Sequence, residues 1–163
     1  MQYNQTTFKT VRHRPHWMQF IINEFIPLCL CLAAFAFAGM EDMPFKGFIL
    51  QIAFLLVLFI LYKFAYLQRL RYFVSSEQLI IQHGVFTSNN NYVELYRIVD
   101  YDERRNFIQQ LVGLKTVTIY SGDRTTPHLD IIGVPVDFDL VAIIRERVEY
   151  NKQRKGVYEI TNR

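Results

Sequence analysis

The side chains best suited to catalysis or metal binding are few, and their spacing favours neither. His13 and His16 are three residues apart, which could place both on one helix face, but Pro15 separates them and no acidic or cysteine partner is near. Cys29 and Cys31 lie in an apolar segment at a spacing that directs them to different sides of a helix. The sequence also lacks Gly-x-Ser-x-Gly, phosphate-loop and His-Glu-x-x-His motifs. We therefore predict that the protein is not an enzyme and has no catalytic residues, metal site or cofactor.

Four arginines are candidates for contact with lipid headgroups. Arg69 and Arg71 follow the second of two apolar segments, and Arg104 and Arg105 end the mixed-charge cluster 100–105. Each basic group close to an anionic leaflet contributes about 1 kcal/mol of binding. The alternative for the cluster is a solvated loop in which charges of opposite sign pair with one another.

Asn23 and Glu24 form a polar pair at the start of the first apolar segment, and two interpretations remain open. If Pro27 lies in the first turn of a helix, where its missing N–H is harmless, the helix begins near Asn23 and Glu24 lies at the headgroup boundary. If the helix runs unbroken from Trp17, Glu24 lies about 10 Å deep. A carboxylate at that depth is a candidate functional site inside the membrane.

Two long apolar segments must position these residues. Residues 25–40 contain no charge, and residues 47–62 contain none either. A membrane-spanning helix needs roughly 20 mostly apolar residues. Extending both runs to that length predicts two transmembrane helices, 21–40 and 47–67, which together form a transmembrane hairpin over residues 20–67.

The connection between the two helices differs in charge from the segments that flank them. Residues 41–46 are too few for anything but a tight turn, and they carry a net negative charge. The flanking segments are basic, with Lys9, Arg12 and Arg14 before the first helix and Lys63, Arg69 and Arg71 after the second. By the positive-inside rule, we expect a multi-pass protein of the cell (plasma or inner) membrane whose two termini, including the N-terminal segment 1–19, are cytoplasmic.

The rest of the chain reads as a folded α+β domain over residues 68–150, followed by a basic tail, 151–163. Apolar alternation predicts strands at 71–74, 78–84, 92–95, 98–102, 115–120 and 128–132, with a polar turn at 88–91. Asn106 and Gly113 bound a short helix, 107–112, and apolar residues at helical spacing predict a closing helix from Leu140 to at least Tyr150. We expect a strongly bent antiparallel sheet or split barrel with a C-terminal amphipathic helix.

Composition excludes several classes of protein. Of the 163 residues, 51% are hydrophobic and 20% charged, so the chain is too apolar to be disordered. Two cysteines are too few for a disulfide-stapled secreted domain. The formal net charge of +3 is too small to suggest nucleic acid as a partner.

Residues 72–148 carry an ordered set of motifs that resembles a bacterial pleckstrin-homology-like (PH-like) domain family of small membrane-anchored proteins. The matching segments are Tyr72-Phe73-Val74, Leu79-Ile80-Ile81, Gly84-Val85-Phe86, Val93 to Ile98, and Phe107 to Leu114 running into Lys115 to Tyr120. The two preceding apolar segments also match the usual architecture of that family. The resemblance implies a membrane-tethered PH-like barrel and supplies no catalytic or ligand-binding residues.

These observations favour a non-enzymatic interaction or scaffold module, tethered at the cytoplasmic face of a bacterial membrane. Its expected partners are the lipid bilayer and either another protein or further copies of itself, with no nucleic acid and no small-molecule substrate. The alternative is an oligomeric channel or transporter subunit in which Glu24 lines a pathway. A membrane-bound hydrolase is a third hypothesis, supported only by scattered His and Asp residues.

Overall fold

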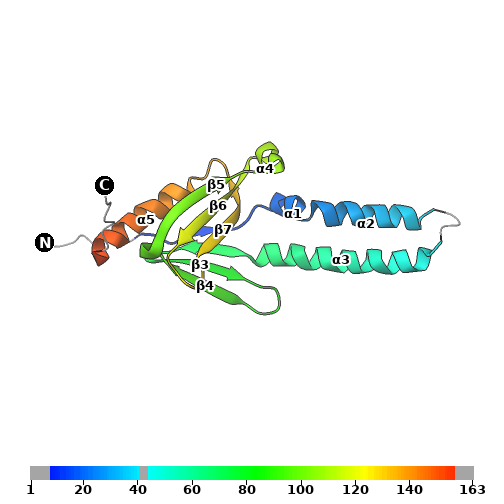
Figure 1. The fold of residues 1–163 in the computed structure, drawn as a ribbon, viewed down its shortest axis with the longest axis horizontal. Coiled ribbons are helices and arrows are strands. Elements are labelled where there is room, and N and C mark those ends of the chain that lie inside the picture. The colour runs from blue at the N-terminus through cyan, green and yellow to red at the C-terminus, as the bar shows by residue number, and fades with distance from the viewer. Residues whose placement is uncertain (1–7, 41–43, 157–163) are drawn as a thin grey trace.

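The computed structural model describes residues 8–40 and 44–156, which form a helical hairpin at one end and an α+β domain at the other (Figure 1). The elements in chain order are β1 (Val11–His13), α1 (Met18–Asn23), α2 (Phe25–Ala38), α3 (Lys46–Arg69), β2 (Arg71–Val74), β3 (Gln78–His83), β4 (Asn89–Glu94), the 3-10 turn η1 (Leu95–Arg97), β5 (Ile98–Arg104), α4 (Phe107–Val112), β6 (Leu114–Ser121), β7 (His128–Pro135) and α5 (Leu140–Lys155). Part of the predicted tight turn, residues 41–43, lies outside the described residues.

The first apolar segment forms two helices where a single transmembrane helix, 21–40, was expected. The backbone leaves helical geometry at Glu24, whose φ and ψ are −106° and 20°, and this separates α1 from α2. Pro27 falls in the first turn of α2, where its missing N–H disturbs nothing. With 14 residues, α2 is about 21 Å long and falls short of the roughly 30 Å hydrocarbon core. The prediction of two full spans is therefore not supported.

Within residues 8–40 and 44–156, α3 is the one helix long and apolar enough to cross a membrane. It has 24 residues, a mean hydropathy of 2.4 over its best window, and only 6% of that window is buried. Its apolar side chains therefore point outward around the helix, a pattern suited to a lipid environment. A helix at the second predicted position, 47–67, is confirmed, and its crossing of a membrane stays a prediction.

Small residues allow α2 and α3 to pack closely side by side. Ala38 and Ala53 are 2% and 0% exposed, and the Cys31 Sγ lies 4.0 Å from the Ala53 carbonyl oxygen. Farther along the hairpin, the rings of Phe20 and Phe64 meet edge to face, with centroids 5.1 Å apart. The helices thus share one antiparallel register.

The α+β domain consists of two antiparallel sheets, ordered β1-β2-β3-β4 and β5-β6-β7, with α5 packed against them. This confirms the predicted α+β class with a closing helix. Val117 and Ile119 on β6 are buried as expected, at 0% and 1% exposed, but Thr118 between them is only 2% exposed, so burial does not alternate along this strand. Helix α5 extends to Lys155, so the first residues of the expected tail belong to the helix.

Strand β1 precedes the helices in the chain and was not predicted. It pairs with β2 in the register that places Val11 opposite Val74, so the hairpin is inserted between two neighbouring strands of one sheet. On the other side, Leu70 alone separates α3 from β2, and its side chain is only 7% exposed. Both ends of the hairpin are therefore fixed to the same sheet.

His13, at the end of β1, is buried between two aromatic rings. It stacks on Tyr72 and Phe138, with ring centroids 6.1 and 5.9 Å away. Burial lowers the pKa of His13, because it disfavours the charged imidazolium. The folded domain therefore holds this residue neutral.

Arg147 is a buried cation that ties α5 to the far end of the first sheet. Its guanidinium donates to the Val74 carbonyl, to the Ser75 carbonyl at 3.0 Å and to the Lys9 carbonyl at 2.8 Å. The side chain also lies over the ring of Phe8, 5.4 Å from its centroid. One side chain thereby holds the segment before β1, the end of β2 and α5 together.

We predict that Arg147→Met lowers the free energy of unfolding by about 2–4 kcal/mol, because it leaves buried carbonyl groups without donors. The matched control is Arg145→Met on the exposed face of the same helix, with an expected loss below about 1 kcal/mol. Thermal unfolding of the full chain in mild detergent measures both, and equal losses would contradict the role given to Arg147.

A second prediction concerns pH. In the unfolded chain the His13 side chain takes up a proton near pH 6.5. In the folded protein its lowered pKa keeps the same side chain neutral at that pH. The stability contribution is thus complete above about pH 6.5 and declines as the pH falls below it. The melting temperature of His13→Phe is expected to fall less between pH 7.5 and 5.5 than that of the unaltered protein; an identical fall would refute this assignment.

Candidate membrane-facing site

An arginine-lined pocket lies where the apolar helix enters the domain. Arg69 is the last residue of α3 and Arg71 the first of β2, so both cations are fixed at this junction. The pocket has a volume of about 150 Å³ and is lined by Arg69, Arg71, Gln82, Gly84, Val85, Phe86 and Ser88. The structure thus brings together two of the four arginines predicted to face lipid headgroups.

The donors of this pocket suit an anionic oxygen group. The Nε of Arg71 is buried and has no hydrogen-bond partner within the described part of the chain. Opposite, the Gln82 amide donates to the Ser88 hydroxyl at 3.2 Å, which orders the wall formed by β3 and the β3–β4 loop. Guanidinium groups bind phosphate oxygens through directional, charge-assisted hydrogen bonds. The pocket can therefore accept a phosphate-sized group.

Gly84 shapes the β3–β4 loop that forms the outer wall. Its φ is +113°, and a Cβ there would lie 1.9 Å from the Thr87 carbonyl oxygen, so only glycine fits. No function was predicted for this loop from its sequence. The available signal was the glycine followed by the apolar Val85 and Phe86 between polar residues.

Arg104 and Arg105 lie at a different place, before α4. The guanidinium of Arg104 donates to Thr118 at 2.6 Å and pairs with Asp130 at 3.3 Å and Asp102 at 3.4 Å. Arg104 thus takes part in the internal charge pairing that was the alternative interpretation of this cluster. Arg105 is exposed beside the start of α4.

Asn23 belongs to a chain of amide hydrogen bonds that joins α1 to the domain. Its Oδ1 accepts from the Gln19 amide at 2.8 Å, and the Gln19 Oε1 accepts from the Gln109 amide at 3.0 Å. Gln109 donates in turn to the Thr116 hydroxyl at 2.9 Å. Both glutamines are 3% exposed. Asn23 therefore has a structural role in attaching α1 to α4 and β6.

Glu24 occupies the break between α1 and α2. Its backbone N–H donates to the Phe20 carbonyl at 2.9 Å, which closes α1, and its own carbonyl accepts from Leu28 at 2.9 Å, which opens α2. Continuing the antiparallel register of the helices places Glu24 about level with Ile60 of α3. Among residues 8–40 and 44–69, Glu24 is the one carboxylate that could support the channel hypothesis, and we do not propose that function.

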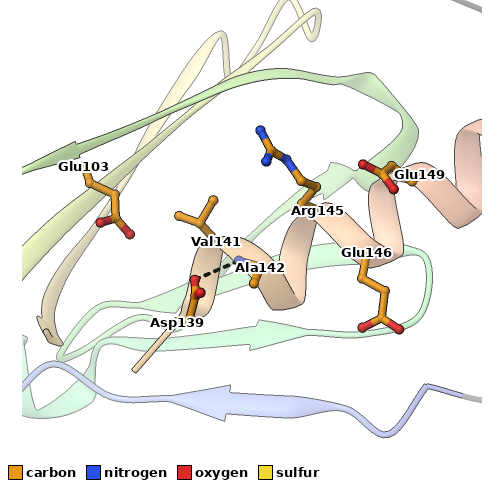
Figure 2. Close-up of a pocket in the computed structure, with 7 residues that line it drawn as sticks. All are labelled: Glu103, Asp139, Val141, Ala142, Arg145, Glu146 and Glu149. Atoms are coloured by element: carbon orange, nitrogen blue, oxygen red, sulfur yellow. Dashed lines mark hydrogen bonds between the residues drawn. The ribbon is translucent and has the colours of Figure 1, made fainter. Parts of the chain in front are cut away.

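A cleft of about 480 Å³ between β5 and α5 is lined mainly by acidic residues (Figure 2). Glu103 comes from β5 and pairs with Lys115 at 2.7 Å, while Asp139 caps α5 by accepting from the Ala142 N–H at 3.0 Å. Glu146 and Glu149 lie on α5 beside Arg145. Within residues 8–40 and 44–156, no three His, Cys, Asp or Glu side chains are grouped to hold a metal ion. Two of the four carboxylates in the cleft thus have structural partners.

The fold and the junction pocket define a class of protein in which a small α+β domain with two antiparallel sheets and a C-terminal helix is fused to apolar helices. A family model described as the bacterial PH domain matches residues 25–148, and the chain belongs to this family. The match begins at α2, so it covers α2 and α3 as well as most of the domain. No curated protein and no solved structure gives a significant match.

We predict that Gln109→Leu destabilises the protein by about 2–3 kcal/mol, because Gln109 also completes the capping box of α4 with Asn106. Removing its amide leaves Gln19 and Thr116 without their partner. Gln110→Leu is the matched control, since Gln110 is exposed and its expected change lies within about 0.5 kcal/mol. Melting temperatures in mild detergent decide between them; a Gln109→Leu variant as stable as its control would argue against the amide chain.

Proposed function

We propose that this protein is a non-enzymatic interaction module of the bacterial inner membrane, tethered by its helices with the PH-like domain at the cytoplasmic face. The observation that carries this proposal is α3, an apolar helix that is almost entirely unburied and passes into β2 through one residue. In water, such an outward-facing apolar surface would drive aggregation, whereas a bilayer covers it.

The attachment between helix and domain supports a scaffold role. Leu67 and Leu70, at the end of α3, belong to the hydrophobic core of the domain. The Leu70 N–H continues the helical hydrogen bonds to Tyr66 and Leu67. Because no flexible linker intervenes, the membrane would fix the orientation of the domain, and with it the face presented to a partner protein or a second copy.

The hairpin would enter the membrane with α2 beside α3 and with α1 at the interface. The Trp17 side chain, next to α1, is 54% exposed, as expected of an interfacial aromatic residue. Arg69 and Arg71 would meet the headgroups of the inner leaflet, each contributing about 1 kcal/mol. Both termini would then be cytoplasmic.

Tethering is tested by adding charge to the outer face of α3. Leu55 and Leu58 are 64% and 48% exposed, and arginine at the centre of a membrane helix costs about 2.5–3.5 kcal/mol. We expect the combined Leu55→Arg and Leu58→Arg substitutions to release the protein from membranes at alkaline pH, where the unaltered chain stays bound. Val99→Arg, at a domain position that is 67% exposed, is the control and should not change extraction.

Orientation and interaction need separate measurements. Protease added to sealed right-side-out vesicles should spare the domain, and digestion there would overturn the cytoplasmic assignment. Cross-linking in whole cells should join the chain to another protein or to itself. If the protein is expressed at its natural abundance and only the uncross-linked chain is recovered, that result would argue against an interaction module.

A further inference from the structure

The β3–β4 loop presents a large apolar side chain at its tip. Phe86 is 93% exposed and lies, after Val85, in the turn between Gly84 and Ser88. The pocket that it borders also contains Arg69 and Arg71. An exposed aromatic ring beside two arginines is the combination that lipid interfaces favour, with the ring in the acyl boundary and the cations at phosphate level.

Contacts with α3 show how far along the helix axis the β3–β4 loop extends. The rings of Phe86 and Tyr62 lie nearly parallel with centroids 6.3 Å apart, and His83 contacts Tyr66 at the same centroid distance. Tyr62 precedes Arg69 by about two helical turns, or roughly 10 Å along the axis. Phe86 therefore lies beyond the level of Arg69, beside the apolar part of the helix.

A second apolar point lies on helix α4. Phe107 and Leu111 are 74% and 72% exposed and, being four residues apart, share one face. The buried Gln109 on another face binds Gln19 of α1. Figure 1 shows α4 and the β3–β4 loop on opposite sides of the hairpin, both at the end of the domain from which the helices leave.

We propose that Phe86, Phe107 and Leu111 form a membrane-docking rim that inserts into the interfacial region of the bilayer on both sides of the hairpin. The pocket of Arg69 and Arg71 then holds a lipid phosphate, and Arg105 faces the headgroups beside α4. This inference rests on the proposed tethering and adds a second mode of lipid contact to it. The bilayer is the occupant because the rim continues the apolar surface of α3 and is flanked by cations.

The rim can be tested with tryptophan reporters and brominated lipids, which quench fluorescence on contact. The chain contains one tryptophan, so Trp17→Phe provides a silent background. Phe86→Trp and Phe107→Trp report on the two sides of the rim. Val99→Trp is the matched control, because Val99 is 67% exposed near the start of β5, at the opposite end of that strand from α4.

Each full-length variant is reconstituted into vesicles of zwitterionic and anionic phospholipids, with and without brominated acyl chains. We expect at least about twofold quenching for the two rim reporters, the behaviour of interfacial aromatic side chains, and none for the control. Adding Arg69→Gln and Arg71→Gln should reduce quenching at Phe86→Trp and leave Phe107→Trp less affected.

The outcomes separate this inference from the tethering proposal. Variants that float with vesicles and resist alkaline extraction, yet show rim reporters no more quenched than the control, would overturn the rim alone. Failure to float would overturn the tether and the rim together. Blue-shifted emission that persists in detergent and depends on protein concentration would assign the rim to a second copy, which also overturns the lipid assignment.

Discussion

The pairing of β1 with β2 is the constraint on which the rest of the structure depends. These neighbouring strands are separated in the chain by the whole helical hairpin, and their register sets Val11 opposite Val74. Closing this long connection fixes both ends of the hairpin on one sheet, so the helices must leave the domain side by side. Because Leu70 alone joins α3 to β2, a rotation of the helix would displace the sheet as well. The direction of α3 therefore determines the orientation of the domain, and one cannot change without the other.

Apolar burial alone is too small to hold the N-terminal segment in place, since β1 has three residues and only His13 among them is buried. Directional polar contacts supply the additional stabilisation of this segment. Arg147 reaches from α5 to carbonyl groups on both sides of the β1–β2 pair, and Gln109 reaches from α4 to α1. Each of these side chains is nearly inaccessible to water, so breaking one leaves partners unsatisfied in a low-dielectric interior. Hydrogen bonds that water does not replace thus hold the segment before β1 at one end of the β1–β2 pair and α1 at the other.

Local patterns in the sequence were sufficient for the elements that depend on local physics. The helix 107–112 follows from its Asn106 cap and Gly113 stop, and α3 from its uniform apolarity. Elements that depend on distant partners were missed. Strand β1 is too short to show alternation, and the asparagines at 89–91, expected in a turn, form a strand because β3 pairs with them. A helix start close to Glu24 was one of the two interpretations that Pro27 allowed, but the contact of α1 with α4 through Gln19 and Gln109 depends on residues far apart in the sequence.

The candidate site was likewise only partly predictable from the sequence. Arg69 and Arg71 could be placed from the sequence because a cation next to an apolar helix end is a local feature. Their pocket could not, since its other wall is a loop brought back by the β3–β4 pairing and bent at Gly84. Arg104 was indistinguishable from them by residue type, but Asp130, 26 residues away, pairs with it. In this protein the arginines proposed to face lipid therefore differ from the structural one in their tertiary neighbours: Arg104 pairs with a carboxylate on β7, on the far side of β6, whereas Arg69 and Arg71 line a pocket with the exposed Phe86. The charge of an arginine that pairs with a carboxylate is compensated within the fold. An arginine beside an exposed phenylalanine keeps its charge available to an anionic surface, into which the ring can also insert.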